Sequence, residues 1–200
     1  MLYLITRKYI KTQYSIKTLL ELLTSEAQPE FKQMAVILLQ KAIFKHFQGL
    51  GEADTKILRD TILKIYFESK IPRVKSILAN LLAKIAEYYF SNEKVWPEVL
   101  NEISKRSEDT SNPDSLMDAI ILLTNMLDSC DEYLKASYAQ ISSFLENVLK
   151  LNKPELTVEV LKCLSYIVGS LDDDELCKQY GYLFQTVMSV SLYLSRHSIL

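Results

Sequence analysis

Four prolines at nearly constant intervals constrain the fold of this chain more than any other feature. Pro29, Pro72, Pro113 and Pro154 are separated by 43, 41 and 41 residues. Proline suits the first turn of a helix, because its φ angle is already helical and its missing N–H would have had no partner there. We therefore predict that each of these prolines starts a helix and that the chain repeats with this period.

Alignment of the four stretches on their prolines places apolar residues in the same columns. The residues ten positions after the prolines are Leu39, Leu82, Leu123 and Leu164. Three positions further on stand Ala42, Ile85, Met126 and Ile167. Other helical patterns lie between these helices, over Tyr14 to Leu23, Thr55 to Phe67, Pro97 to Ser104, Glu132 to Leu149 and Asp174 to Leu194. Each repeat is therefore predicted to be a pair of helices.

Two-helix units of about 40 to 47 residues are typical of HEAT and armadillo arrays. We predict an all-α, right-handed α-solenoid of HEAT repeats, built from antiparallel helix pairs without a β-sheet, in which the leucine column lines one core. Only four glycines and five prolines occur, which are too few turn formers for a β-sandwich or a β-barrel. The predicted boundaries are a partial repeat over 1–48, repeats over 49–90, 91–130 and 131–171, and the first helix of an incomplete repeat over 172–200.

The helix predicted from Pro29 is apolar on more than one side. Its main apolar stripe is Phe31, Ala35, Leu38, Leu39 and Ala42. A second helix in such an array packs against its partner and both neighbouring repeats, so only a narrow strip remains open to the concave face. On helical phase, that strip consists of Gln33, Ile37, Gln40, Lys41 and Phe44. Its mixture of polar and apolar residues is expected of a protein-binding surface.

Composition excludes several other classes of function. The three cysteines show no CxxC spacing, which argues against a zinc site or a disulfide framework, and the net charge is only −2. Basic residues are not clustered as a nucleic-acid surface requires, and no apolar run reaches the length of a membrane span. No phosphate loop, nucleophile elbow or carboxylate pair stands out. We therefore expect a soluble intracellular protein that is not an enzyme and holds no metal or cofactor.

Three further features have ordinary structural interpretations. Trp96, the one tryptophan, precedes Pro97 and is expected to lock its loop onto the core. His46 is expected to pack at a helix end. The acidic run from Asp172 to Glu175 is expected to cap the following helix, although a contact with a basic partner is an alternative.

Two segments resemble the importin-β (karyopherin-β) family of nuclear transport receptors. The stretch "LLELLTSEAQPEFKQMAVILLQKAIFKHF", residues 19–47, is similar to the importin N-terminal motif. The positions that match the motif are Lys32, Gln33, Ala35, Lys45 and Phe47. The stretch "KVWPEVLNEI", residues 94–103, resembles the Trp-Pro segment that opens a first helix in many importins. The segment "SLMDAIILLTNMLDSCDEYL" looks most like the importin-four branch.

This resemblance implies a receptor that binds the Ran GTPase in its GTP form, carries protein cargo such as histones or ribosomal proteins, contacts nucleoporins and shuttles between cytoplasm and nucleus. It implies no direct contact with nucleic acid or membrane. The family's Ran contacts on second helices map here onto Gln33, Gln40, Lys41, Asn80, Lys84, Asn125 and Lys162.

Family members begin with a further helix ahead of the segment matching Thr6 to Tyr14 and are several-fold longer, so we expect this sequence to be part of a longer chain. The repeat alone would also suit a HEAT scaffold, such as a phosphatase or vesicle-coat adaptor subunit. Binding of GTP-loaded Ran distinguishes the two functions.

Overall fold

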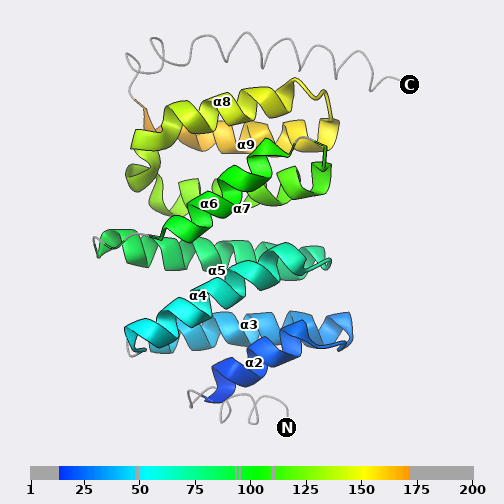
Figure 1. The fold of residues 1–200 in the computed structure, drawn as a ribbon, viewed down its shortest axis with the longest axis vertical. Helices are drawn as coiled ribbons and strands as arrows, with labels where there is room; N and C mark the ends of the chain where they lie inside the picture. The colour runs from blue at the N-terminus through cyan, green and yellow to red at the C-terminus, as the bar shows by residue number, and fades with distance from the viewer. Residues whose placement is uncertain (1–13, 48–49, 93, 95, 110, 172–200) are drawn as a thin grey trace. The chain divides into compact units, whose positions relative to one another are not determined.

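The described part of the chain is helical throughout, as predicted (Figure 1). A computed structural model describes residues 14–47, 50–92, 94, 96–109 and 111–171. The predicted helix from Asp174 to Leu194 and the acidic run at Asp172 to Glu175 lie outside these residues. The side chain of His46 also lies outside them. Within the described ranges, α-helices and short 3₁₀ turns are the only regular elements.

The helices begin where the proline spacing predicts. Their bounds are α2 (Tyr14–Thr24), α3 (Pro29–His46), α4 (Glu52–Glu68), α5 (Pro72–Ser91), α6 (Pro97–Glu108), α7 (Pro113–Leu134), α8 (Tyr138–Leu149) and α9 (Pro154–Ser170). The four repeat prolines are therefore the first residues of α3, α5, α7 and α9.

One predicted helix is wrong, because the stretch from Glu132 to Leu149 is not continuous. Helix α7 runs on to Leu134, and a 3₁₀ turn over Lys135–Ser137 separates it from α8. Near its end α7 is kinked at Cys130, where φ is −148° and ψ is 40°. The Cys130 thiol donates a hydrogen bond to the carbonyl of Met126 at 3.0 Å. No proline or glycine marks this break, so the local sequence pattern did not reveal it.

The chain divides into two compact units, Met1–Ile85 and Ala86–Leu200, which we call unit 1 and unit 2. In unit 1, α2 packs against α3 and also contacts α4. In unit 2, α6 packs against α7, α8 packs against α9, and α7 contacts α9. Each unit therefore shows pairing within a repeat and stacking between equivalent helices of successive repeats, which is the packing of a helical-repeat array.

The leucine column is buried in both units. The exposed fractions are 0% for Leu39, 0% for Leu82, 2% for Leu123 and 6% for Leu164. Three residues later, Ala42, Ile85, Met126 and Ile167 are at most 2% exposed. The repeat register inferred from the prolines therefore agrees with the core.

Trp96 takes the predicted structural role. Trp96 is the N-cap residue of α6, and its side chain is fully buried. Its ring lies 6.2 Å from the ring of Tyr89, measured between centroids. An indole with one tilted aromatic neighbour and no exposed surface fixes the loop that leads into Pro97.

The start of α7 gives a test of local helix stabilisation. The Asn112 side chain accepts a hydrogen bond from the backbone N–H of Ser115 at 3.1 Å. We expect Asn112→Ala to lower the free energy of unfolding by about 0.5–2 kcal/mol, because a helix N–H loses its partner. Urea denaturation followed by circular dichroism measures this loss. Lys153→Ala is the control, because Lys153 caps α9 without a side-chain hydrogen bond; equal losses in the two variants would contradict the role of Asn112.

Candidate partner-binding surface

All seven residues predicted to face a partner lie on the second helix of a pair. Unit 1 contributes five of them, with Gln33, Gln40 and Lys41 on α3 and Asn80 and Lys84 on α5. Unit 2 contributes Asn125 on α7 and Lys162 on α9.

In unit 1, two of the predicted residues bond to each other. The Gln40 Nε2 donates to the Asn80 Oδ1 at 3.1 Å, and both side chains are half-buried. This hydrogen bond joins α3 to α5. The side chains of Lys41 and Lys84, which hold equivalent repeat positions, are exposed on the same two helices. Unit 1 therefore presents two cations close to a polar bond that holds their helices together.

The remaining strip residues of α3 are mixed. Gln33 and Ile37 are half-buried, and Phe44 is 56% exposed. The assignment of Phe31 to the core-facing stripe is wrong, because Phe31 is 58% exposed whereas Ala35 is buried. Helical phase gives the direction of a side chain but not whether a neighbour covers it.

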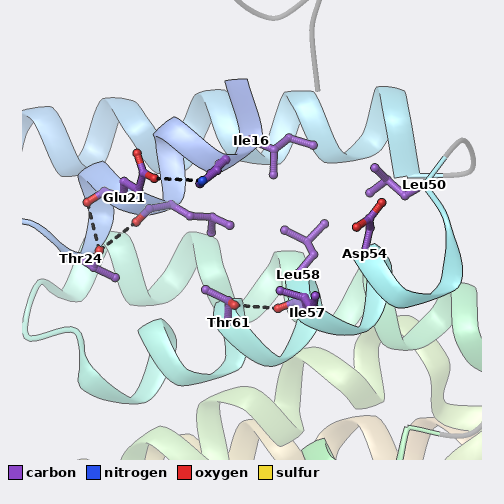
Figure 2. Close-up of a pocket in the computed structure, with 10 residues that line it drawn as sticks. Ile16, Glu21, Thr24, Leu50, Asp54, Ile57, Leu58 and Thr61 are labelled. Carbon is purple, nitrogen blue, oxygen red and sulfur yellow. Dashed lines mark hydrogen bonds and ion pairs between the residues drawn. The ribbon is translucent and has the colours of Figure 1, made fainter. Parts of the chain in front are cut away.

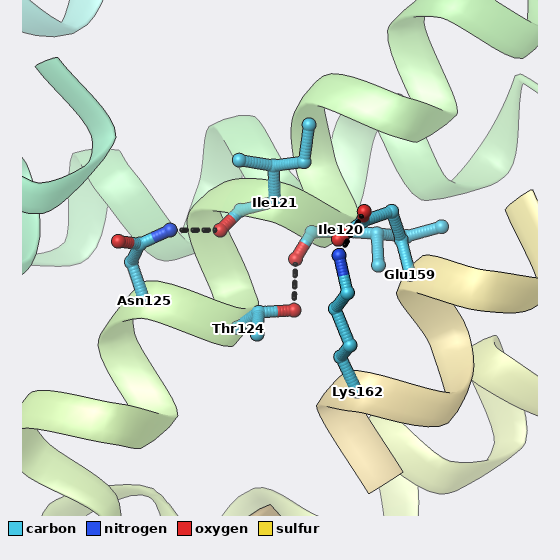
Figure 3. A network of polar contacts seen from close by, with 6 residues as sticks. All are labelled: Ile120, Ile121, Thr124, Asn125, Glu159 and Lys162. Atoms are coloured by element: carbon cyan, nitrogen blue, oxygen red, sulfur yellow. Dashed lines mark hydrogen bonds and ion pairs between the residues drawn. The ribbon is translucent and has the colours of Figure 1, made fainter. Parts of the chain in front are cut away.

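In unit 2, both predicted residues are engaged within their own helices (Figure 3). The Asn125 Nδ2 donates to the carbonyl of Ile121 at 2.8 Å. The Lys162 Nζ forms a 2.7 Å ion pair with Glu159, one turn earlier on α9. The Glu159–Lys162 pair has no net charge, which lowers its attraction for an acidic partner. The i, i+3 spacing of Glu159 and Lys162 was the sequence signal for this pair.

A buried thiol and an exposed phenol lie on α9. Burial raises the pKa of the Cys163 thiol from 9.0 to about 12, against a side-chain hydrogen bond with Thr124 that lowers it. The negative charge of Asp128 raises the pKa of Tyr166. Both groups are therefore neutral near pH 7, and neither offers an activated nucleophile.

The Cys163 pKa predicts the alkaline stability of the protein. The folded chain keeps the thiol proton between pH 9 and about 12 while the unfolded chain loses it. The contribution of the protonated Cys163 thiol to the free energy of unfolding is complete below pH 9. It is lost as the pH rises toward 12. We expect Cys163→Ala to show a shallower fall in unfolding free energy than the parent over this window, measured by urea denaturation at several pH values. Identical slopes would contradict the prediction.

A cavity of about 620 Å³ lies in unit 1 between α2 and α4 (Figure 2). Its apolar lining consists of Ile16, Leu20, Leu50, Ile57 and Leu58. Its polar lining consists of Lys17, Glu21, Thr24, Asp54 and Thr61. Lys17 and Glu21 lie 4.0 Å apart, so their charges offset each other at the rim. The cavity can accept apolar side chains, but its lining residues include no histidine or cysteine for catalysis.

Among the described residues, no group of three histidine, cysteine, aspartate or glutamate side chains is arranged to hold a metal ion. No helix in the same part of the chain is long and apolar enough to cross a membrane.

Comparison with known families matches nearly the whole chain. Residues 7–68 match the family described as "Importin-beta N-terminal domain", a range that contains α2 to α4. Residues 70–197 match the family described as "IPO5-like, TPR repeats", a range that contains α5 to α9. No curated protein matches the chain.

Proposed function

Because this chain belongs to the importin-β family, we propose that it is the segment of a nuclear import receptor that binds the Ran GTPase in its GTP state and helps to carry protein cargo through the nuclear pore. The observation that carries the proposal is the N-terminal-domain match over residues 7–68, since that domain is the Ran-binding region of the family. Members of the family are transport receptors rather than enzymes.

The geometry of unit 1 supports a place for Ran on α3 and α5. Lys41 and Lys84 are exposed on helices that the Gln40–Asn80 hydrogen bond joins. Exposed cations at equivalent repeat positions attract acidic groups of a partner and speed its association. Gln33 is the remaining candidate of unit 1; it lies on α3 and its side chain is half-buried. Asn125 and Lys162 are the unit 2 candidates, and their polar groups have partners on α7 and α9.

The proposal also concerns the class of cargo and the branch of the importin-β family. Residues 111–200 carry six lysines and arginines against twelve acids. This excess of acidic residues suits basic cargo, which supports histones or ribosomal proteins as the class of cargo. Contacts with nucleoporins and shuttling between cytoplasm and nucleus follow from the proposed role. The importin-four branch is a proposal only, because the family matched over residues 70–197 is described as IPO5-like.

Binding of Ran in its two nucleotide states tests the function. We expect this chain to bind Ran loaded with a non-hydrolysable GTP analogue and to bind GDP-loaded Ran at least about tenfold more weakly, a difference of about 1.4 kcal/mol. Isothermal titration calorimetry with both forms measures it. Equal affinity for the two forms would contradict a Ran-regulated receptor, and absence of binding to either would favour the HEAT scaffold.

A further inference from the structure

One position of the repeat is accessible to solvent on all four helices that begin with a repeat proline. The residue twelve positions after the proline is Lys41 on α3, Lys84 on α5, Asn125 on α7 and Tyr166 on α9. Three of these side chains are exposed and that of Asn125 is half-buried, whereas the leucine two positions earlier is buried in every case. We call Lys41, Lys84, Asn125 and Tyr166 the open column.

The exposure of Tyr166 follows from its place in the repeat. Lys84 and Asn125 hold the same position in repeats that have a described repeat before and after them in the sequence, and both side chains remain accessible. Stacking of repeats therefore leaves this position uncovered even where neighbouring repeats are present. The 39% exposure of Tyr166 has the same cause.

A carboxylate lies beside the open column in unit 2. Asp128 is exposed on α7, about one helical turn after Asn125. Its negative charge, together with a hydrogen bond that the Tyr166 phenol donates to it, raises the pKa of Tyr166. This bond joins α7 to α9, two helices that also pack against each other. The Tyr166 ring is therefore held next to a negative charge, with part of its surface open to solvent.

The local charge favours a cation as the ligand of this aromatic–carboxylate pair. The Tyr166 phenol is neutral near pH 7, so it does not offset the charge of Asp128. Lys162, one turn before Tyr166 on α9, forms a 2.7 Å ion pair with Glu159, and that pair adds no net charge. The phosphates of a nucleic acid and the acidic side chains of a protein would both be repelled by Asp128. A lysine or arginine side chain would be attracted.

We propose that Tyr166 and Asp128 bind a lysine or arginine side chain from a basic segment of a partner protein. The cation lies over the face of the Tyr166 ring, which attracts it through the ring quadrupole, and its N–H groups bond to the Asp128 carboxylate. The Asn125 amide oxygen points away from the Ile121 carbonyl that its nitrogen contacts, so it is placed to accept an N–H of the same segment (Figure 3). Only the role of this partner as cargo rests on the proposed import function.

A basic peptide tests the site. The probe is a fluorescein-labelled peptide of alternating lysine and serine, titrated against the full chain by fluorescence anisotropy. Tyr166→Ala should weaken binding by about fivefold, or about 1 kcal/mol, because the cation–π contact is lost. Tyr166→Phe keeps the ring and should weaken it less. Asp128→Asn should weaken binding mainly at low salt, because salt screens exposed charges.

Two variants in unit 2 serve as matched controls. Tyr133→Ala removes a tyrosine that is 49% exposed on α7 but lies outside the open column. Glu108→Gln removes one exposed negative charge on α6, the same change in charge as Asp128→Asn. Both controls should bind the lysine peptide as the parent does.

Several outcomes would overturn the proposal. They are failure of the parent to bind the peptide, equal losses in Tyr166→Ala and Tyr133→Ala, and equal binding of a peptide with glutamate in place of lysine. Equal losses in Asp128→Asn and Glu108→Gln would assign the effect to overall charge. A dimer of the parent that Tyr166→Ala dissociates, detected by light scattering, would make a second copy the occupant.

Calorimetric titration with GTP-loaded Ran separates this site from the proposed function. Tyr166 and Asp128 are not among the candidate Ran contacts, so Tyr166→Ala should bind Ran as the parent does. A parent chain that binds the lysine peptide but not Ran would retain the cation site and contradict the import function. A parent chain that binds Ran but not the peptide would do the reverse.

Discussion

Replacement of Leu82 by alanine is expected to lower the free energy of unfolding by about 2–5 kcal/mol. The Leu82 side chain is fully buried on α5, in the leucine column that defines the repeat. Removing it loses the transfer free energy of the side chain and leaves a cavity that the helix pair fills only partly. Urea denaturation followed by far-ultraviolet circular dichroism measures the loss.

Leu100→Ala is the matched control for Leu82→Ala. Leu100 is 37% exposed on α6, so the same chemical change there removes a side chain that already contacts water. We expect a smaller loss, because less apolar surface is returned to solvent. The repeat register would be wrong if Leu82→Ala were as stable as the parent or if Leu100→Ala cost more.

The double variant Lys41→Glu, Lys84→Glu is expected to lower affinity for GTP-loaded Ran by about tenfold or more at low salt. Both lysines are exposed on the helices that the Gln40–Asn80 hydrogen bond joins, so reversal of their charges turns attraction into repulsion. Exposed charges act mainly on the association rate and are screened by salt. Surface plasmon resonance at two salt concentrations measures both effects, and circular dichroism should show unchanged helicity.

The control for this pair is Lys56→Glu, Lys64→Glu. These two lysines are exposed on α4, a first helix of unit 1, and their reversal changes the net charge by the same amount. We expect nearly normal Ran binding by this control. If both double variants bound Ran equally weakly, the effect would come from overall charge. Normal binding by Lys41→Glu, Lys84→Glu would remove these lysines from the site while leaving the receptor function intact.

The Gln40–Asn80 bond changes how the candidate site is understood. From the sequence, both residues were predicted to contact a partner directly. Their side chains lie 3.1 Å apart and bond to each other, although the residues are 40 positions apart in the chain. Their amides therefore contribute first to the spacing of α3 and α5, and through it to the spacing of Lys41 and Lys84. Helical phase could place both residues on one face but could not show that they meet.

The sequence by itself determined the helix starts, the repeat period and the buried columns. These are local properties, since proline favours a first turn and apolar residues at helical spacing favour one buried face. The burial of Leu39 in unit 1 and of Leu164 in unit 2 followed from that pattern. The family resemblance also came from contiguous segments, and the matches over residues 7–68 and 70–197 agree with it.

Only the tertiary structure decided which side chains are covered and which polar groups are already paired. Phe31 has the phase of a core residue but is 58% exposed, whereas Leu156 at the same repeat position is buried. The kink at Cys130 and the start of α8 at Tyr138 were equally hidden from the sequence pattern. Exposure and pairing depend on the helix that lies alongside, and that neighbour comes from a part of the chain about one repeat away.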